Sequence, residues 1–128
     1  MMTKSDYNKI CFLQALENKC DKIFLDYANN FGEADAEEVT KRVSMSSSII
    51  AVRASQVIDC VVAKTNCRIN ELLIKVILAK IRYVIISELV FFSTCFDFYD
   101  LDLTTLDRLK YINFPFEFYL KAYIQEVV

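Results

Sequence analysis

The sequence predicts an all-α protein, a single compact helical bundle around a central hydrophobic helix, with residues 1–128 forming one helical domain. The chain contains one glycine and one proline, whereas strands, hairpins and phosphate-binding loops need several glycines and turn residues. Hydrophobic residues make up 55% of the 128 positions, which is enough to bury a full core. Apolar residues also recur at spacings of three and four, as a helix face requires.

The first predicted helix runs from Ser5 to Phe31. Thr3 or Ser5 can cap its first backbone amides, and Gly32 follows as a residue that turns the chain out of a helix. The residues expected to face the core are Leu13, Leu16, Cys20, Ile23, Tyr27 and Phe31.

The next segment allows two interpretations. Glu33 to Met45 is a polar helix, and Ser48 to Lys64 is an apolar one, with three serines between them. Because serine competes for backbone hydrogen bonds, the serines predict a break and a new N-cap. The alternative is one long helix within residues 34–66, since one heptad register nearly continues through the serines. Its members are Ala36, Val39, Val43, Ile50, Ala54, Val57 and Val61.

The central element is a helix from Ile69 to about Phe96, after a short connection at residues 65–67. It is apolar on nearly every side, so we expect other helices to surround it. Whether it breaks near Ser87 stays open. Lys80 belongs to a thin polar seam, along which its charge reaches water.

The C-terminal part consists of a loop and two helices. Asp97 to Asp102 is the loop, and a short helix follows from Thr104 or Thr105 to Ile112. Pro115 is suited to the first position of the last helix, which runs from Phe116 to Val127. Its expected inward residues are Phe116, Leu120, Tyr123 and Ile124.

The residue types argue against catalysis, a metal site and a cofactor. The chain contains no histidine, which is the usual general base near neutral pH. Its single glycine excludes the glycine-rich phosphate loop and the dinucleotide-binding fingerprint. The acidic residues Asp97, Asp100 and Asp102 lack the spacing of a calcium loop, so we expect a solvated loop. A net charge of -2 argues against nucleic acid as a partner.

The five cysteines are expected to be reduced, and most of them to be small buried hydrophobic residues. Their number is odd, their spacings are wide, and no Cys-x-x-Cys occurs. They are Cys11, Cys20, Cys60, Cys67 and Cys95.

No segment is expected to cross a membrane. The most apolar stretch, from Ile69 to Phe96, is interrupted by charged residues, whereas a spanning helix needs about 20 residues nearly free of charge. The C-terminal segment from Tyr119 to Val128 is too short for a tail anchor.

Aromatic residues point to a protein-binding surface. The chain has ten phenylalanines and seven tyrosines. The tyrosines cannot all be interior without hydrogen-bond partners for their hydroxyl groups, so some should reach the surface. Together with the apolar central helix, this predicts either a groove for a partner helix or a homodimer face.

Two short stretches resemble the Bcl-2-like apoptosis regulators, particularly the divergent members of large DNA viruses. Residues 18–31, NKCDKIFLDYANNF, resemble an early helical segment of these viral proteins. The shared residues are Cys20, Asp21, Ile23, Tyr27, Ala28, Asn30 and Phe31. The second stretch is Asn66-Cys67-Arg68-Ile69, where the family has Asn-Trp-Gly-Arg-Ile at the head of its central helix.

The resemblance implies a non-enzymatic, Bcl-2-like inhibitor of apoptosis that sequesters pro-apoptotic ligand helices of the host in a hydrophobic groove. By this resemblance, Arg68 pairs with an aspartate of the ligand helix, a contact that fixes the register of the helix. The expected location is the cytoplasm of the host cell, or a peripheral site at mitochondria, and a homodimer is a further expectation. The residues expected to contact the partner are Arg68, Asn66, Ile69, Tyr27, Phe31, Val57 and Val61.

An alternative interpretation is a helical assembly subunit without DNA contacts. The predicted helices 48–64, 69–96 and 104–112 match the short–long–short order of the histone fold, and residues 64–68 resemble a histone loop. Such a subunit usually needs a partner to cover its long helix, whereas a Bcl-2-like protein folds alone.

Overall fold

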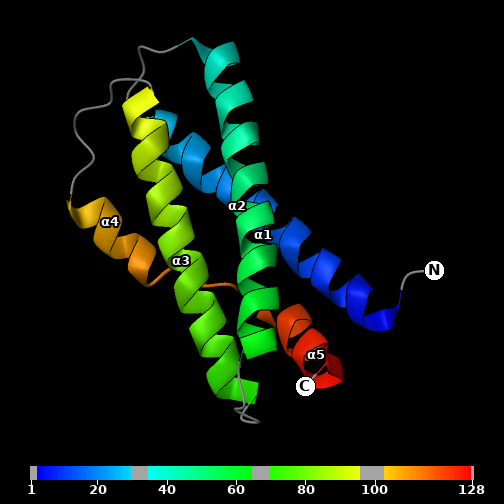
Figure 1. Cartoon of the computed structure of the whole chain (residues 1–128). Helices are drawn as coiled ribbons and strands as arrows, with labels where there is room; N and C mark the ends of the chain where they lie inside the picture. The colour runs from blue at the N-terminus through cyan, green and yellow to red at the C-terminus, as the bar shows by residue number, and fades with distance from the viewer. Residues whose placement is uncertain (1–2, 30–34, 65–69, 96–102, 128) are drawn as a thin grey trace.

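Five helices make up the part of the chain that the computed structural model describes, residues 3–29, 35–64, 70–95 and 103–127. They are α1 (Lys4–Asn29), α2 (Ala36–Lys64), α3 (Asn70–Cys95), α4 (Leu103–Lys110) and α5 (Glu117–Val127). Figure 1 shows α2 and α3 side by side, with α1 crossing behind them. α1 packs on α2 and α5, while α3 packs on α2, α4 and α5. The predicted all-α helical bundle is confirmed.

The N-terminus of α1 is closed by a reciprocal capping box. The backbone amide of Asp6 donates to Thr3 Oγ1 at 3.1 Å, and the amide of Thr3 donates to Asp6 Oδ2 at 3.4 Å. Thr3 therefore caps α1. It is one of the two residues, Thr3 and Ser5, that were predicted as the cap. The predicted end of this helix at Phe31 and the turn at Gly32 lie outside the described residues.

The buried face of α1 is turned slightly about the helix axis from the predicted face. Leu16, Cys20 and Tyr27 are buried as expected, whereas Leu13 and Ile23 are only half-buried, at the edges of the face. At 3.6 residues per turn, a face centred on Leu16 and Cys20 also takes in the neighbouring phenylalanines. The buried residues of α1 are Phe12, Leu16, Cys20, Phe24, Tyr27 and Ala28.

α2 is one continuous helix of 29 residues, so the serines do not break it. Asp35 caps it, because its Oδ1 accepts a hydrogen bond from the Glu37 amide at 2.9 Å. A serine inside a helix costs at most about 0.7 kcal/mol relative to alanine, and packing outweighs this cost here. The buried residues are Val39, Val43, Ser46, Ser47, Ile50, Ala54 and Ile58.

The length of α2 removes the helix order on which the histone-fold interpretation depends. That interpretation needs a short helix before the long central one. α2 has 29 residues and α3 has 26, so the helix before α3 is the longer of the two.

α3 continues through Ser87 without a break. Its buried face packs on three helices, but the expectation that helices surround it is wrong, because a row of its apolar side chains faces solvent. With α1 packed mainly on α2 and α5, no described helix covers this outer face. Its exposed large apolar residues are Leu72, Val76, Tyr83, Val90 and Phe91.

The turn that connects α4 to α5 is anchored by the buried Phe114, whereas Tyr111, Asn113 and Pro115 in it are exposed. α4 ends at Lys110, and the Nε of Arg82 donates to the backbone oxygen of Ile112 at 3.0 Å, which ties the turn to α3. Pro115 lies in this turn and not at the first helical position, since α5 begins at Glu117. Three of the four residues predicted to face inward, Leu120, Tyr123 and Ile124, are buried in α5, whereas Phe116 lies before α5 and is half-buried.

By length and composition alone, α2 is apolar enough to cross a membrane, with a mean hydropathy of 1.3 over its most apolar 18 residues. Within the described residues, α2 is the one helix that meets this criterion, and it packs on α1 and α3. The stretch from Ile69 to Phe96 and the C-terminal segment were the ones considered from the sequence.

Candidate functional site

An open apolar groove lies between the last turns of α2 and the first half of α3. Its volume is about 390 Å³. Leu72 and Val76 stay partly open to solvent inside it, with exposed fractions of 49% and 38%. Its lining residues are Cys60, Val61, Lys64, Leu72, Leu73, Val76 and Lys80. The groove therefore offers an incoming side chain a mainly aliphatic wall.

The two helices that form the groove are held together beyond it. Arg53 Nη1 lies 3.1 Å from Glu88 Oε1, and the Glu88 side chain is only 12% exposed. The guanidinium of Arg42 lies 4.9 Å from the ring centroid of Phe91. Because both contacts join α2 to the second half of α3, they position the two walls while the end near Lys64 stays open.

The charged residues of the groove are both cationic. Lys64 and Lys80 line it together with apolar residues, and no acidic residue is among its lining residues. A carboxylate approaching this face would be attracted by both ammonium groups. The groove is thus complementary to a helix with an apolar face and an acidic residue beside it.

Four of the predicted partner-contacting residues lie outside the described residues: Phe31, Asn66, Arg68 and Ile69. In the sequence, the segment that contains Arg68 lies between Lys64, which lines the groove, and Asn70, the first residue of α3.

Tyr27, which was predicted to contact a partner, lies in the core. Its side chain is 7% exposed. Its hydroxyl group donates to Ser93 Oγ at 3.2 Å, and its ring lies 6.4 Å from that of Phe92. Tyr27 therefore connects α1 to α3 and does not line the groove.

The structure separates the two predicted valines of α2. Val61 lines the groove, whereas Val57 is half-buried against the core and is not among the lining residues. Leu72 and Val76 line the groove but were not among the residues predicted to contact the partner. Val76 follows Leu72 by four residues and Tyr83 follows Val76 by seven, so the three residues lie on one face of a helix. Because α3 is apolar on nearly every side, this spacing does not distinguish them from its other apolar residues.

The cysteines are more exposed than predicted. Of the four in the described part of the chain, only Cys20 is buried, while Cys60 and Cys95 are exposed and Cys11 is half-buried. Cys60 lines the groove, where its thiol is a small wall residue open to solvent. Cys60 and Cys95 lie on outward faces of α2 and α3. Composition alone does not predict which face of a helix points outward.

Within the described ranges, no group of three or more Cys, Asp or Glu side chains is placed to hold a metal ion. The acidic residues Asp97, Asp100 and Asp102 lie outside those ranges. The described site offers an apolar surface and two ammonium groups on a pair of packed helices. The chain matches no protein-family model, no curated protein and no solved structure.

Proposed function

We infer that this chain is a non-enzymatic protein-binding module, a Bcl-2-like inhibitor of apoptosis that sequesters pro-apoptotic ligand helices of the host. The groove between α2 and α3 is the proposed binding site. The module acts in the cytoplasm of the host cell, or peripherally at mitochondria.

The observation that carries this proposal is an apolar, cation-lined groove at the end of α2 and the start of α3. Its volume of about 390 Å³ falls in the range of about 300–1,000 Å³ that is usual for binding pockets. A helix docks in such a groove by inserting apolar side chains spaced by three and four. Lys64 and Lys80 favour a ligand helix that carries acidic residues.

The sequence resemblance supports the same site. Arg68 lies two residues before the start of α3 in the sequence, as the family's arginine lies at the head of the central helix. We propose that its guanidinium pairs with an aspartate of the ligand helix, a bidentate contact that sets the helix register.

Calorimetric titration with a panel of pro-apoptotic ligand-helix peptides tests the proposal. We expect saturable binding to at least one peptide. Arg68→Glu should abolish it by placing like charges together, and Val76→Asp should weaken it about tenfold or more by charging the groove wall. Val76 is 38% exposed, so the variant should fold.

Val52→Asp is the matched control, because Val52 is an exposed valine of α2 that does not line the groove. It should bind like the unmodified chain. A folded protein that binds no peptide of the panel contradicts the apoptotic role. Binding that survives both Arg68→Glu and Val76→Asp contradicts the site.

A further inference from the structure

The outer face of α3 carries an apolar strip that is free of charge along its length. Its exposed residues recur at spacings of four and three, so they lie on one side of the helix. The outer strip consists of Leu72, Val76, Ala79, Tyr83 and Val90, and the exposed Ser87 among them is small and uncharged. At about 1.5 Å per residue, the strip is about 27 Å long. It is a long apolar surface that the described helices leave open to solvent.

The apolar surface continues from the outer strip onto α2. Phe91, the residue after the last one of the strip, is half exposed, and the guanidinium of Arg42 lies 4.9 Å from its ring centroid. Nη1 of the same arginine lies 3.3 Å from Sδ of the exposed Met45. Because α2 and α3 lie side by side (Figure 1), the strip and these contacts form one broad face and not a single ridge.

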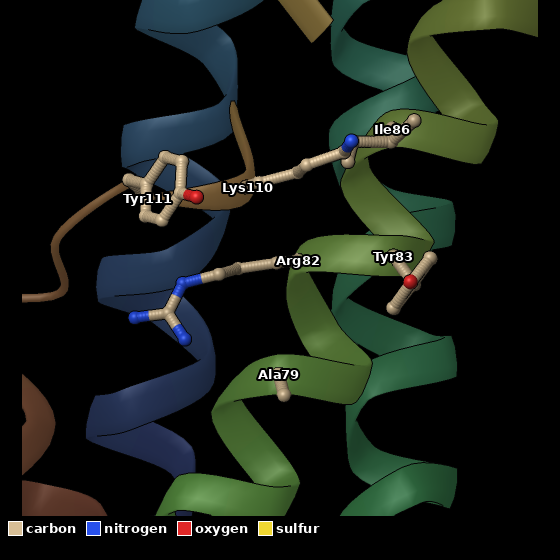
Figure 2. Close-up of a pocket in the computed structure, with 6 residues that line it drawn as sticks. All are labelled: Ala79, Arg82, Tyr83, Ile86, Lys110 and Tyr111. Atoms are coloured by element: carbon tan, nitrogen blue, oxygen red, sulfur yellow. The ribbon is translucent and has the colours of Figure 1, made fainter. Parts of the chain in front are cut away.

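Positively charged residues border the outer strip on both sides. Lys80 lies on the side of α2, because it lines the groove together with Lys64 of α2. Arg82 lies on the side of α4, because it lines a cavity of about 210 Å³ together with Lys110 of α4. Figure 2 shows Arg82 and Tyr83 pointing in opposite directions from α3, and Lys110 reaching from the end of α4 towards α3. The exposed ring of Tyr83 therefore lies between two cationic edges.

The acidic residues of α2 and α3 lie away from the outer strip. Asp59 forms an ion pair with a lysine of α1, on the other side of α2. Glu88 is only 12% exposed and is paired with an arginine of α2. Glu71 lines a cavity on the α5 side of α3, and Glu37 and Glu38 belong to the first turn of α2. In these two described helices, the charges that border the strip are thus cationic.

The apolar composition of α2 exceeds what its core contacts account for. An 18-residue stretch of α2 has a mean hydropathy of 1.3, high enough for a membrane-crossing helix, yet only 28% of this stretch is buried inside the protein. A core helix that is apolar on every side is normally one that other helices cover. Much of the apolar surface of α2 therefore lies outside the core, next to the outer strip.

We propose that this outer face docks the chain on the surface of an anionic lipid bilayer. α2 and α3 lie flat on the membrane, with the apolar strip at the boundary of the acyl chains and with Lys80 and Arg82 at the level of the lipid phosphates. Tyr83 is 71% exposed and Tyr111 is 85% exposed, and amphipathic rings of this kind favour the interfacial layer. An apolar face with cations along its edges is the pattern of helices that lie in the surface of anionic membranes.

A bilayer is the occupant because the charge of the face selects it. The surface of an anionic bilayer attracts the cations on both edges of the strip at the same time. A second copy of the chain would bring like charges together, and a helix in the groove would meet only the edge beside Lys80. A bilayer also requires no matching recess or ridge, which suits an open face on two helices that lie side by side.

Docking on a bilayer would also cover the proposed ligand groove. Leu72 and Val76 belong both to the outer strip and to the groove wall, so lipid binding and ligand binding compete for the same two residues. This competition rests on the proposed function. The lipid contact itself names a surface for the peripheral membrane location, and it needs no apoptotic ligand.

Co-sedimentation of the full chain with lipid vesicles, without any peptide, tests the docking. The two vesicle compositions are phosphatidylcholine alone and an equal mixture of phosphatidylcholine and phosphatidylserine. We expect binding to the anionic vesicles to be stronger by about tenfold or more. Lys80→Gln should weaken this binding about fivefold, since it removes one charge at the surface. Tyr83→Asp should weaken it about tenfold or more, since it places a carboxylate at the acyl-chain boundary.

Lys22→Gln and Tyr7→Asp are the matched controls, because Lys22 and Tyr7 are exposed residues of α1, outside the outer face. Lys22→Gln changes the net charge as Lys80→Gln does, and both controls should bind nearly as the unmodified chain does. Circular dichroism checks that each variant is folded.

A folded chain that does not bind the anionic vesicles overturns the proposal, and so does equal binding to the two compositions. Binding that both Lys80→Gln and Tyr83→Asp leave unchanged also overturns it. Self-association without vesicles that Tyr83→Asp abolishes would show that a second copy covers the face, against the proposal. Because no peptide is present, each of these outcomes leaves the calorimetric titration of the groove as a separate test.

Discussion

Cys20 shows how burial changes the chemistry of a single residue. Its side chain is fully buried in α1. Loss of hydration disfavours the thiolate, and the carboxylates of Asp21 and Glu17 add to this effect, so the pKa of the Cys20 thiol rises from 9.0 to about 12. The thiol therefore behaves as a small apolar side chain and is protected from the reactions of a thiolate.

This raised pKa predicts a loss of stability in alkaline solution. The folded state keeps the Cys20 proton up to about pH 12, while the unfolded state releases it near pH 9. Stability from this group is fully present below pH 9 and falls as the pH rises from 9 towards 12. The expected slope is about 1.4 kcal/mol per pH unit.

Urea unfolding of the unmodified chain and of Cys20→Ala at pH 8 to 11 measures this slope. The substitution should lower the free energy of unfolding at pH 8, since it leaves a small cavity. Above pH 9 the difference between the two proteins should shrink. Parallel pH profiles for the two proteins would show that Cys20 ionises in the folded state as it does in the unfolded one.

Among the helices, α2 illustrates how packing overrides a local break signal. Ser46 and Ser47 are 1% and 0% exposed, inside a continuous helix. In the described part of the chain, neither hydroxyl oxygen has a hydrogen-bond partner. A buried hydroxyl group without a partner costs free energy. The two serines therefore lower the free energy of unfolding of the protein.

Ser47→Ala should therefore stabilise the protein. Alanine removes a buried unpaired hydroxyl group and has the higher helix propensity, so we expect the free energy of unfolding to rise by about 1 kcal/mol. Ser48→Ala is the control, because Ser48 is exposed on the same helix, and should change it by only a few tenths of a kcal/mol. Thermal unfolding gives the comparison; a destabilised Ser47→Ala would mean that the hydroxyl group has a partner.

For the whole molecule, the arrangement of the helices leaves one apolar face open. α2 and α3 lie side by side and α1 crosses behind them (Figure 1). The outer side of this pair carries the groove, with Lys64 and Lys80 among its lining residues. These two lysines decide how salt affects the proposed ligand complex.

The proposed ligand complex should weaken as the salt concentration rises. An acidic ligand helix is attracted by Lys64 and Lys80, so its dissociation constant should rise several-fold between 0.1 M and 1 M NaCl, as the Debye length falls from about 10 Å to about 3 Å.

Calorimetry at both salt concentrations measures this trend. In Lys80→Gln, which removes one of the two charges, the effect of salt should be smaller. A ligand complex that tightens with salt would contradict the role of the cationic wall.

Local signals in the sequence were sufficient to predict much of the fold. The scarcity of glycine and proline, with helical apolar spacing, predicted the all-α class. Thr3, one of the two predicted caps, does cap α1, and Leu120 and Ile124 of α5 face inward as predicted. These features depend on residues within a few turns of one another, so the sequence determines them directly.

Only the tertiary structure decided which apolar residues stay open. Tyr27 and Tyr83 are residues of the same type, yet one is 7% exposed in the core and the other is 71% exposed on the outer face of α3. α3 is apolar on nearly every side, so its own pattern does not say which face other helices cover. That choice depends on where α2, α4 and α5 pack. The groove therefore exists because the helices leave one face of α3 uncovered, which no local pattern in the sequence specifies.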